Sequence, residues 1–107
     1  MSVVHLLTHL PPDRSEEVME ELLSGRRFRV ERIVSHGHVS PPGFWYDQAW
    51  HEWVLVLQGA ARIVLAEPDE TVALGPGDAL LIPAHRRHRV DWTDPEQPTV
   101  WLAIHFD

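Results

Sequence analysis

The sequence predicts an all-β fold, a small barrel or sandwich of short strands, with one short helix near the N-terminus. From residue 27 onward, apolar and polar residues alternate with the period of a β-strand. Clusters of glycine, proline and acidic residues interrupt this pattern at short intervals, as turns do between the strands of a barrel. A chain of 107 residues has room for one core, so a single domain is expected.

The N-terminal segment, residues 1–26, is expected to carry a helix that covers the barrel. Asp13 and Glu16 have the spacing of a capping box at a helix start. Gly25 stands where a helix end favours a left-handed residue. Between these signals, four apolar side chains fall on one helical face: Val18, Met19, Leu22 and Leu23.

The remaining residues, 27–107, are expected to form the barrel domain. Alternation, apolar runs and turn residues between them predict eight strands: 28–34, 44–48, 53–57, 61–65, 71–74, 79–82, 88–92 and 99–106. Gly59 and Gly77 fall at turns between strands, where a positive φ favours glycine.

Composition and charge exclude several classes of function. The formal charge is −7, and the one basic cluster, residues 85–89, is too short to bind nucleic acid or an anionic membrane. The absence of cysteine excludes disulfides and thiolate chemistry. We see neither a signal peptide nor an apolar run of the ~18 residues that a membrane span requires, and therefore expect a cytoplasmic protein.

Two short sequence motifs resemble those of the cupin family. In the first, Glu52 is followed seven positions later by Gly59, and Gly43 lies near the place of the opening glycine. In the second, Gly77, Pro83 and His88 match the family spacing. The resemblance covers roughly residues 33–106. It implies a cupin β-barrel of the double-stranded β-helix or jelly-roll type, and it also implies a homodimer.

Cupins usually hold one divalent metal with three histidines and a glutamate. Here the first histidine pair is replaced by Tyr46 and Gln48, or by Trp45 and Asp47 if the gap is one residue longer. The resemblance and the strand alternation lead us to expect Gln48, Glu52 and His88 as metal ligands, with Tyr46 pointing into the same pocket as a catalytic residue. Such a set suits a divalent ion such as Zn, Ni, Fe or Mn. A hydrogen-bonded polar cluster without a metal is the alternative, and Asp47 competes with Gln48 for the inward position.

Four other histidines are candidates for the same pocket. His51 lies on the opposite face of the strand from Glu52 and is expected at the surface or an interface. His36 and His38 lie too far upstream of Glu52 for the family spacing and are expected at a strand end, with a place for one of them in the pocket as the alternative. His105 shares a strand face with Trp101, and either a pocket or an edge position fits it.

The cupin scaffold carries many unrelated activities, so the resemblance does not select a reaction. We rank a metal-binding cupin acting on or binding a small organic molecule first. A metal-free, non-catalytic ligand-binding cupin comes second, and a structural dimeric barrel third. Apolar residues on both faces of strands 52–57 and 99–106 support the expected homodimer, because one barrel interior covers only one face.

Overall fold

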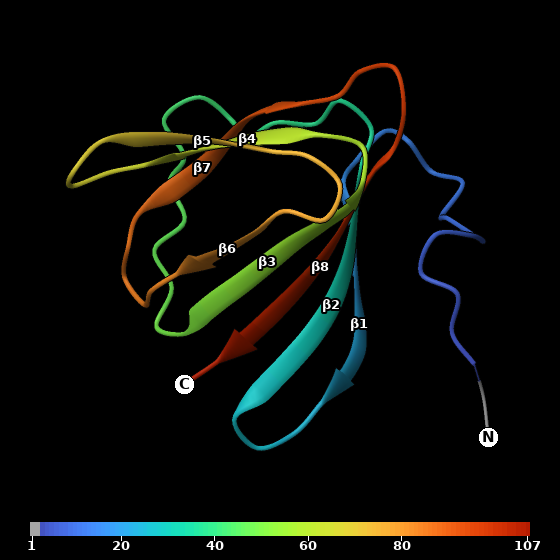
Figure 1. The fold of residues 1–107 in the computed structure, drawn as a ribbon, viewed down its shortest axis with the longest axis horizontal. Helices are drawn as coiled ribbons and strands as arrows, with labels where there is room; N and C mark the ends of the chain where they lie inside the picture. The colour runs from blue at the N-terminus through green and yellow to red at the C-terminus, as the bar shows by residue number, and fades with distance from the viewer. Residues whose placement is uncertain (1–2) are drawn as a thin grey trace.

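The computed structural model describes residues 3–107, and its strands form two antiparallel sheets that face each other (Figure 1). The larger sheet has the order β1-β2-β8-β3-β6, and the smaller has the order β5-β4-β7. The elements are β1 (Val18–Ser24), β2 (Phe28–Ser35), β3 (His51–Gln58), β4 (Ala61–Leu65), β5 (Glu70–Leu74), β6 (Ala79–Ile82), β7 (His88–Thr93) and β8 (Thr99–Phe106). The all-β prediction is confirmed.

The expected N-terminal helix is wrong, because residues 18–24 form the edge strand β1 of the larger sheet. β1 pairs with β2, and this pairing places Glu20 opposite Arg32. Arg32 is only 6% exposed, and its Nε and Nη2 donate to Glu20 Oε1 at 3.0 and 2.7 Å. Strand pairing therefore gives a buried guanidinium the carboxylate it needs, and this outweighs the local helical pattern. Asp13 accepts from the Ser15 amide at 2.9 Å without capping a helix.

Residues 44–48 also differ from the prediction, since they do not form a named strand. Tyr46 alone pairs with His88, through Tyr46 N–H to His88 O at 2.8 Å and His88 N–H to Tyr46 O at 3.1 Å. This isolated bridge nevertheless fixes the loop before β3 against the first residue of β7. It places the Tyr46 side chain beside that of His88.

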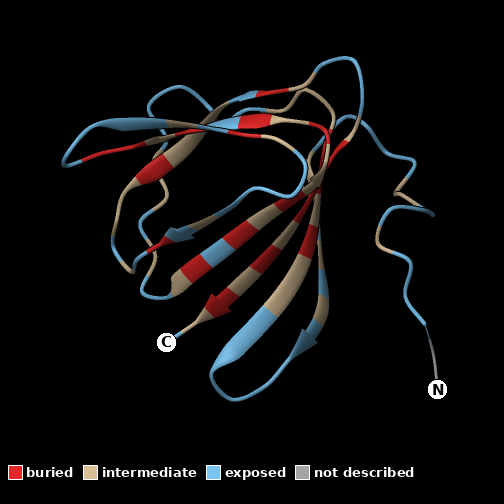
Figure 2. Cartoon of the chain, in the orientation of Figure 1, coloured by how far each residue is buried: buried red, intermediate tan, exposed pale blue. Residues whose placement is uncertain are grey.

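The core lies between the two sheets and follows the predicted alternation. Along β3 and β8, buried residues recur at every second position, which Figure 2 shows as red bands. The core residues of both sheets are Val54, Val56, Ala61, Ile63, Leu65, Leu74, Ile82 and Trp101. Because Glu52 and His105 occupy inward positions of the same two strands, the fold carries polar side chains into one end of this core.

Gly59 is required where β3 turns into β4. Its φ is +84°, and a Cβ there would lie 2.7 Å from Thr99 Cα. Both observations exclude a side chain, because a left-handed backbone and a close approach each favour glycine. Gly77 has φ +89° at the turn before β6, as predicted.

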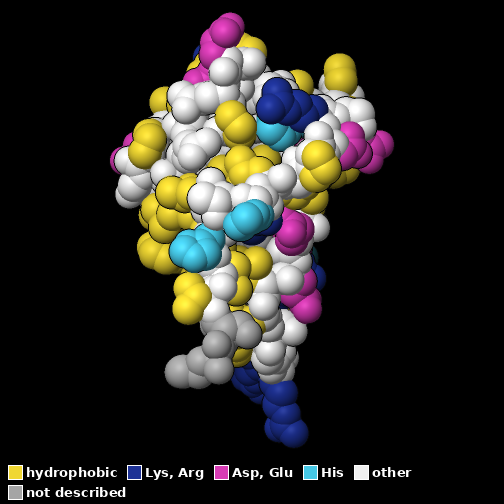
Figure 3. All heavy atoms as spheres, turned by 90° about the vertical axis from the view of Figure 1, so that its right-hand side faces the viewer, with side chains coloured by type: hydrophobic (Ala, Val, Ile, Leu, Met, Phe, Trp, Pro, Cys, Tyr) yellow, Lys and Arg dark blue, Asp and Glu magenta, His cyan; other side chains and the backbone are white. Residues whose placement is uncertain are grey.

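The outer surface is mixed in character on the face that Figure 3 shows. On the side where the N-terminal segment lies, Figure 3 shows hydrophobic side chains mixed with separate acidic and basic groups rather than one continuous basic surface. Within residues 3–107, no helix has the length and apolar character needed to cross a membrane.

Candidate functional site

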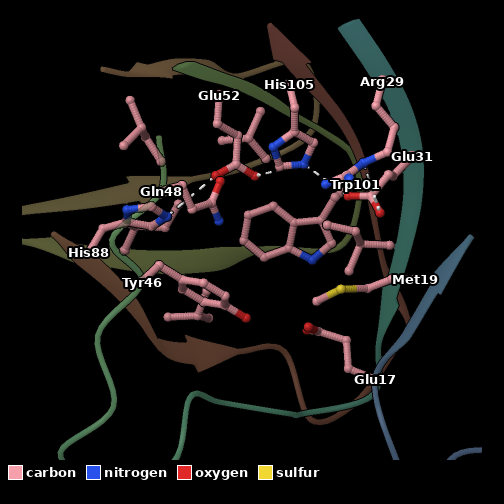
Figure 4. Close-up of a pocket in the computed structure, with 15 residues that line it drawn as sticks. Glu17, Met19, Arg29, Glu31, Tyr46, Gln48, Glu52, His88, Trp101 and His105 are labelled. Atoms are coloured by element: carbon pink, nitrogen blue, oxygen red, sulfur yellow. Dashed lines mark hydrogen bonds and ion pairs between the residues drawn. The ribbon is translucent and has the colours of Figure 1, made fainter. Parts of the chain in front are cut away.

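The candidate site is a cavity of about 150 Å³ at the polar end of the core. Figure 4 shows the side chains that enter it from both sheets and from the loop before β3. Its polar lining consists of Glu17, Arg29, Glu31, Tyr46, Gln48, Glu52, His88 and His105, and its apolar lining of Met19, Ile33, Val54, Ile63, Ile82, Val90 and Trp101. A cavity with a largely apolar wall and a few converging polar groups is the usual form of a ligand site.

The side chains of Glu52 and His88 lie side by side at the polar end of this cavity. Glu52 Oε1 lies 3.4 Å from His88 Nε2, and the two residues are 8% and 5% exposed. The other ring nitrogen, His88 Nδ1, lies 2.9 Å from Arg86 O. A carbonyl oxygen only accepts, so Nδ1 carries a hydrogen. His88 Nε2 then accepts in the neutral ring and pairs with the Glu52 carboxylate in the protonated ring.

No hydrogen bond to the Glu52 carboxylate is found within residues 3–107. Besides His88, its near polar neighbour is His105 Nε2, which lies 3.9 Å from Glu52 Oε2. His105 Nε2 donates to Glu31 Oε1 at 2.9 Å, and the dashed lines of Figure 4 mark this bond together with the ion pairs of Glu52 with His88 and His105. The Glu52 carboxylate lines the cavity, where a group that comes from outside the chain can reach it.

Tyr46 forms one wall of the cavity and stacks on His88, with ring centroids 5.2 Å apart and an interplanar angle of 22°. Burial raises the pKa of its hydroxyl, and the carboxylates of Glu17, Glu52 and Glu31 raise it further. The phenol therefore stays protonated near neutral pH and can donate a hydrogen bond.

Glu17 reaches the cavity from the residue just before β1. It accepts a hydrogen bond from Ser35 Oγ at 2.5 Å, and Ser35 Oγ in turn accepts from Trp101 Nε1 at 3.1 Å. Burial raises the pKa of the Glu17 carboxyl, although the Ser35 hydrogen bond opposes this shift. Glu17 is thereby held on the opposite side of the cavity from His88, with the Trp101 ring between them (Figure 4).

The structure brings the four expected site residues Tyr46, Gln48, Glu52 and His88 to one cavity. Gln48 takes the inward position, while Asp47 is exposed and bonds to His85 Nδ1 at 2.8 Å. His51 accepts from the Ala84 amide at 2.9 Å, away from Glu52.

Sequence reasoning missed Glu17 and Glu31 as pocket residues and left His105 undecided. The expected helix placed Glu17 outside the barrel. The alternation of Arg29, Glu31 and Ile33 on one face of β2 was the signal that could have found Glu31.

The metal that cupins usually hold has an incomplete ligand set here. Among the side chains of residues 3–107, no group of three or more His, Asp or Glu is arranged to hold a metal ion. Glu52 and His88 offer two ligand atoms, and Gln48 could add an amide oxygen. The second imidazole of the cavity, His105, is engaged with Glu31.

The comparison with family models matches the cupin domain over residues 28–105. The chain belongs to the cupin family. A protein of Ralstonia eutropha JMP134, described as a "putative mannose-6-phosphate isomerase", has a TM-score of 0.94 and 44% identity, with 100% of this chain and 99% of that chain covered.

Two more distant structures share the fold. A cupin superfamily protein from Desulfitobacterium hafniense DCB-2 has a TM-score of 0.73 at 20% identity, over 91% of this chain and 83% of its own. An RmlC-like cupin from Desulfovibrio desulfuricans has a TM-score of 0.75 at 20% identity, over 98% and 96%. No curated protein matches the chain.

Proposed function

We propose that this cupin binds a small organic molecule in the barrel cavity, with Glu52 and His88 as its polar anchor. The observation that carries this proposal is the Glu52–His88 pair, with Oε1 and Nε2 3.4 Å apart, at the wall of a largely apolar cavity. A cavity of about 150 Å³ accommodates a molecule the size of benzene. The apolar wall supplies burial, and the pair supplies orientation.

Tyr46 is the proposed catalytic residue if the ligand is turned over. Its raised pKa keeps the hydrogen on the phenol near neutral pH, so Tyr46 would act on the ligand as a hydrogen-bond donor and not as a base. The Glu52 carboxylate is one of the groups of the same cavity that could accept a proton. A hydrogen-bond donor and a carboxylate in one cavity fit a reaction that removes a proton from a small molecule.

A divalent metal held by Gln48, Glu52 and His88 is the second candidate. The observation in its favour is the hydrogen bond from His88 Nδ1 to a backbone carbonyl, which is how proteins commonly orient a metal-binding imidazole. Zn, Ni, Fe or Mn would suit these ligands, and when bound would polarise a ligand oxygen. This candidate comes second because the described residues contain no group of three or more His, Asp or Glu side chains arranged to hold a metal ion.

The 44% identical Ralstonia protein suggests a phosphorylated sugar as a ligand to consider. Three carboxylates line the cavity of this chain, those of Glu17, Glu31 and Glu52. Because like charges repel at short range, this lining disfavours a phosphate dianion. We therefore carry over the binding of a small organic molecule but not the phosphate group.

The test measures metal content and ligand binding on the same samples, purified without a metal-affinity tag. Glu52→Ala and His88→Ala remove the anchor, and Asp47→Ala is the control because Asp47 lies near by but faces solvent. The proposal predicts fragment binding, seen by NMR, that is lost in the two anchor variants and kept in the control.

The metal result separates the two candidates. Near one equivalent of a transition metal, lost in both anchor variants and kept in the control, would favour the metal site over the organic ligand. If the wild-type protein binds neither a metal nor a fragment, both candidate functions are contradicted.

A homodimer remains a prediction, and the outer face of β3 and β6 is the surface proposed for it. Trp53 and Leu81 are register partners there and are 41% and 53% exposed. No helix covers this face within residues 3–107, which leaves a second copy of the chain as the expected cover. Sedimentation velocity should show a dimer that Trp53→Glu dissociates. Trp92→Glu, on the other sheet, should leave it intact, and a monomeric wild-type protein would refute the prediction.

A further inference from the structure

The Glu52 carboxylate is the charged acceptor at the polar end of the cavity. His88 Nε2 lies 3.4 Å from Glu52 Oε1, and no other side chain of residues 3–107 donates a hydrogen bond to this carboxylate. A ligand that donates hydrogens can bond to the carboxylate, whereas a negatively charged ligand would be repelled by it. An ammonium group, with three N–H donors and a positive charge, can bond to Glu52 and, while the ring of His88 is neutral, to its Nε2.

The charges around the cavity also favour a cation. Three carboxylates line it, and Arg29 is the one arginine among the lining residues. Arg29 is already paired, with Nε 3.6 Å from Glu31 Oε2, and its side chain is 46% exposed at the rim. His105 donates to Glu31 from Nε2 and needs no charge to do so. One proton shared by Glu52 and His88 would neutralise that pair, which still leaves Glu17 without a cationic partner in the cavity.

The remaining residues of the cavity wall determine the size and the apolar character of the ligand. Val54, Ile63 and Ile82 close one side with aliphatic surface. Tyr46 and Trp101 add aromatic rings, which attract a cation held over their faces. A volume of about 150 Å³ limits the body to about the size of one six-membered ring.

We propose that the ligand class is a small organic amine, a protonated amino group on an apolar body of about one ring. This inference rests on the proposed function of the cavity and specifies its ligand. The amino group would lie between Glu52 and His88, and the apolar body would lie against the aliphatic wall and Trp101. Carboxylates and phosphate esters of the same size would be excluded, because they bring acceptors and negative charge to a site that already has both.

Matched probes test the proposal, because they differ in one group on the same ring. Binding of benzylamine, benzyl alcohol and benzoate to the wild-type protein is measured at pH 7 by NMR and calorimetry, with mannose 6-phosphate as a fourth probe. We expect benzylamine to bind at least ~10-fold more tightly than benzyl alcohol, which corresponds to one charge-assisted hydrogen bond. Benzoate and mannose 6-phosphate should bind too weakly to measure.

Variants locate the effect. Glu52→Gln should reduce the preference for benzylamine over benzyl alcohol by about 10-fold, because a neutral amide replaces the carboxylate. Asp47→Asn removes one surface charge near the same loop and should leave the preference unchanged. An unchanged preference in Glu52→Gln would overturn the proposed position of the amino group.

The probes also separate this inference from the proposed function. Benzyl alcohol, benzoate or mannose 6-phosphate binding as tightly as benzylamine would overturn the amine while leaving a small-molecule cavity. No binding of any of the four probes would overturn both.

Discussion

Two buried charged side chains of this barrel differ in their hydrogen-bond partners. Arg32, on the outer face of the larger sheet, donates to Glu20 and to the carbonyl oxygens of His5, Leu6 and Thr8. Glu52, at the polar end of the core, receives no hydrogen bond within residues 3–107, and has only the longer contacts to His88 Nε2 at 3.4 Å and His105 Nε2 at 3.9 Å. Their exposed fractions are nearly equal, 6% and 8%. Burial alone therefore does not separate a structural charge from a functional one, whereas the hydrogen-bond partners do.

The comparison has a physical basis. A buried charge that is fully hydrogen-bonded stabilises the arrangement around it, and here Arg32 ties the N-terminal segment and β1 to β2. A buried charge without donors costs stability and is retained where a ligand supplies the partner. Removing each charge should therefore have opposite consequences for the fold.

The largest expected effect is on the Arg32 side of the comparison. Arg32→Ala should lower the free energy of unfolding by about 2–3 kcal/mol, because it leaves Glu20 and three carbonyls without their donor. Urea unfolding measures this change. Arg32→Lys keeps the charge but loses the planar fork and should cost about half as much. A loss below about 0.5 kcal/mol in Arg32→Ala would break the distinction between the two charges.

A smaller effect on stability is expected at His105, which is hydrogen-bonded to Glu31 beside Glu52. His105→Ala removes the donor to Glu31 and should cost about 1–2 kcal/mol in urea unfolding. His105→Gln keeps an amide donor and is expected to recover part of that loss. Equal losses in the two variants would show that packing, and not the hydrogen bond to Glu31, accounts for the effect.

The smallest effect concerns Glu17 and depends on pH. Burial raises the folded-state pKa of Glu17 above its ordinary value of 4.5, so the folded protein holds this proton more tightly than the unfolded chain does. Stability is therefore lost as the pH rises through the folded-state pKa, and the ionised group costs stability above it. Glu17→Gln should be more stable than the wild type at pH 7, and this advantage should disappear as the pH falls below about 4.5. Thermal unfolding across this pH range measures the difference, and an advantage that grows on acidification would contradict it.

Much of the barrel was predictable because alternation and turn residues are local signals. β4, β6 and β8 have the predicted bounds, and the positive φ at Gly59 and Gly77 followed from their place in turns. The helix was a wrong prediction because the spacing of residues 18–23 also fits an edge strand with a bulge. The structure places that bulge between Glu21 and Leu23. Only the distant partner Arg32 decides between the two.

The site was predictable in part for the same reason. Glu52 and His88 lie at the starts of β3 and β7, and the motif resemblance together with alternation assigned them to inward faces. The choice between Asp47 and Gln48 was not local, because it depends on the bond from Asp47 to His85 across the loop. Glu31 and His105 meet only through the pairing of β2 with β8, which the sequence does not specify.

The stability of Glu52→Gln without ligand tests the central claim most directly. The variant keeps the shape of the side chain and removes the charge, and equilibrium urea unfolding at pH 7 compares it with the wild type. If Glu52 is held without donors for a ligand, the variant should be as stable as the wild type or more stable by about 1 kcal/mol. A loss of about 2 kcal/mol or more would contradict the account, because it would show that the carboxylate, like Arg32, serves the fold.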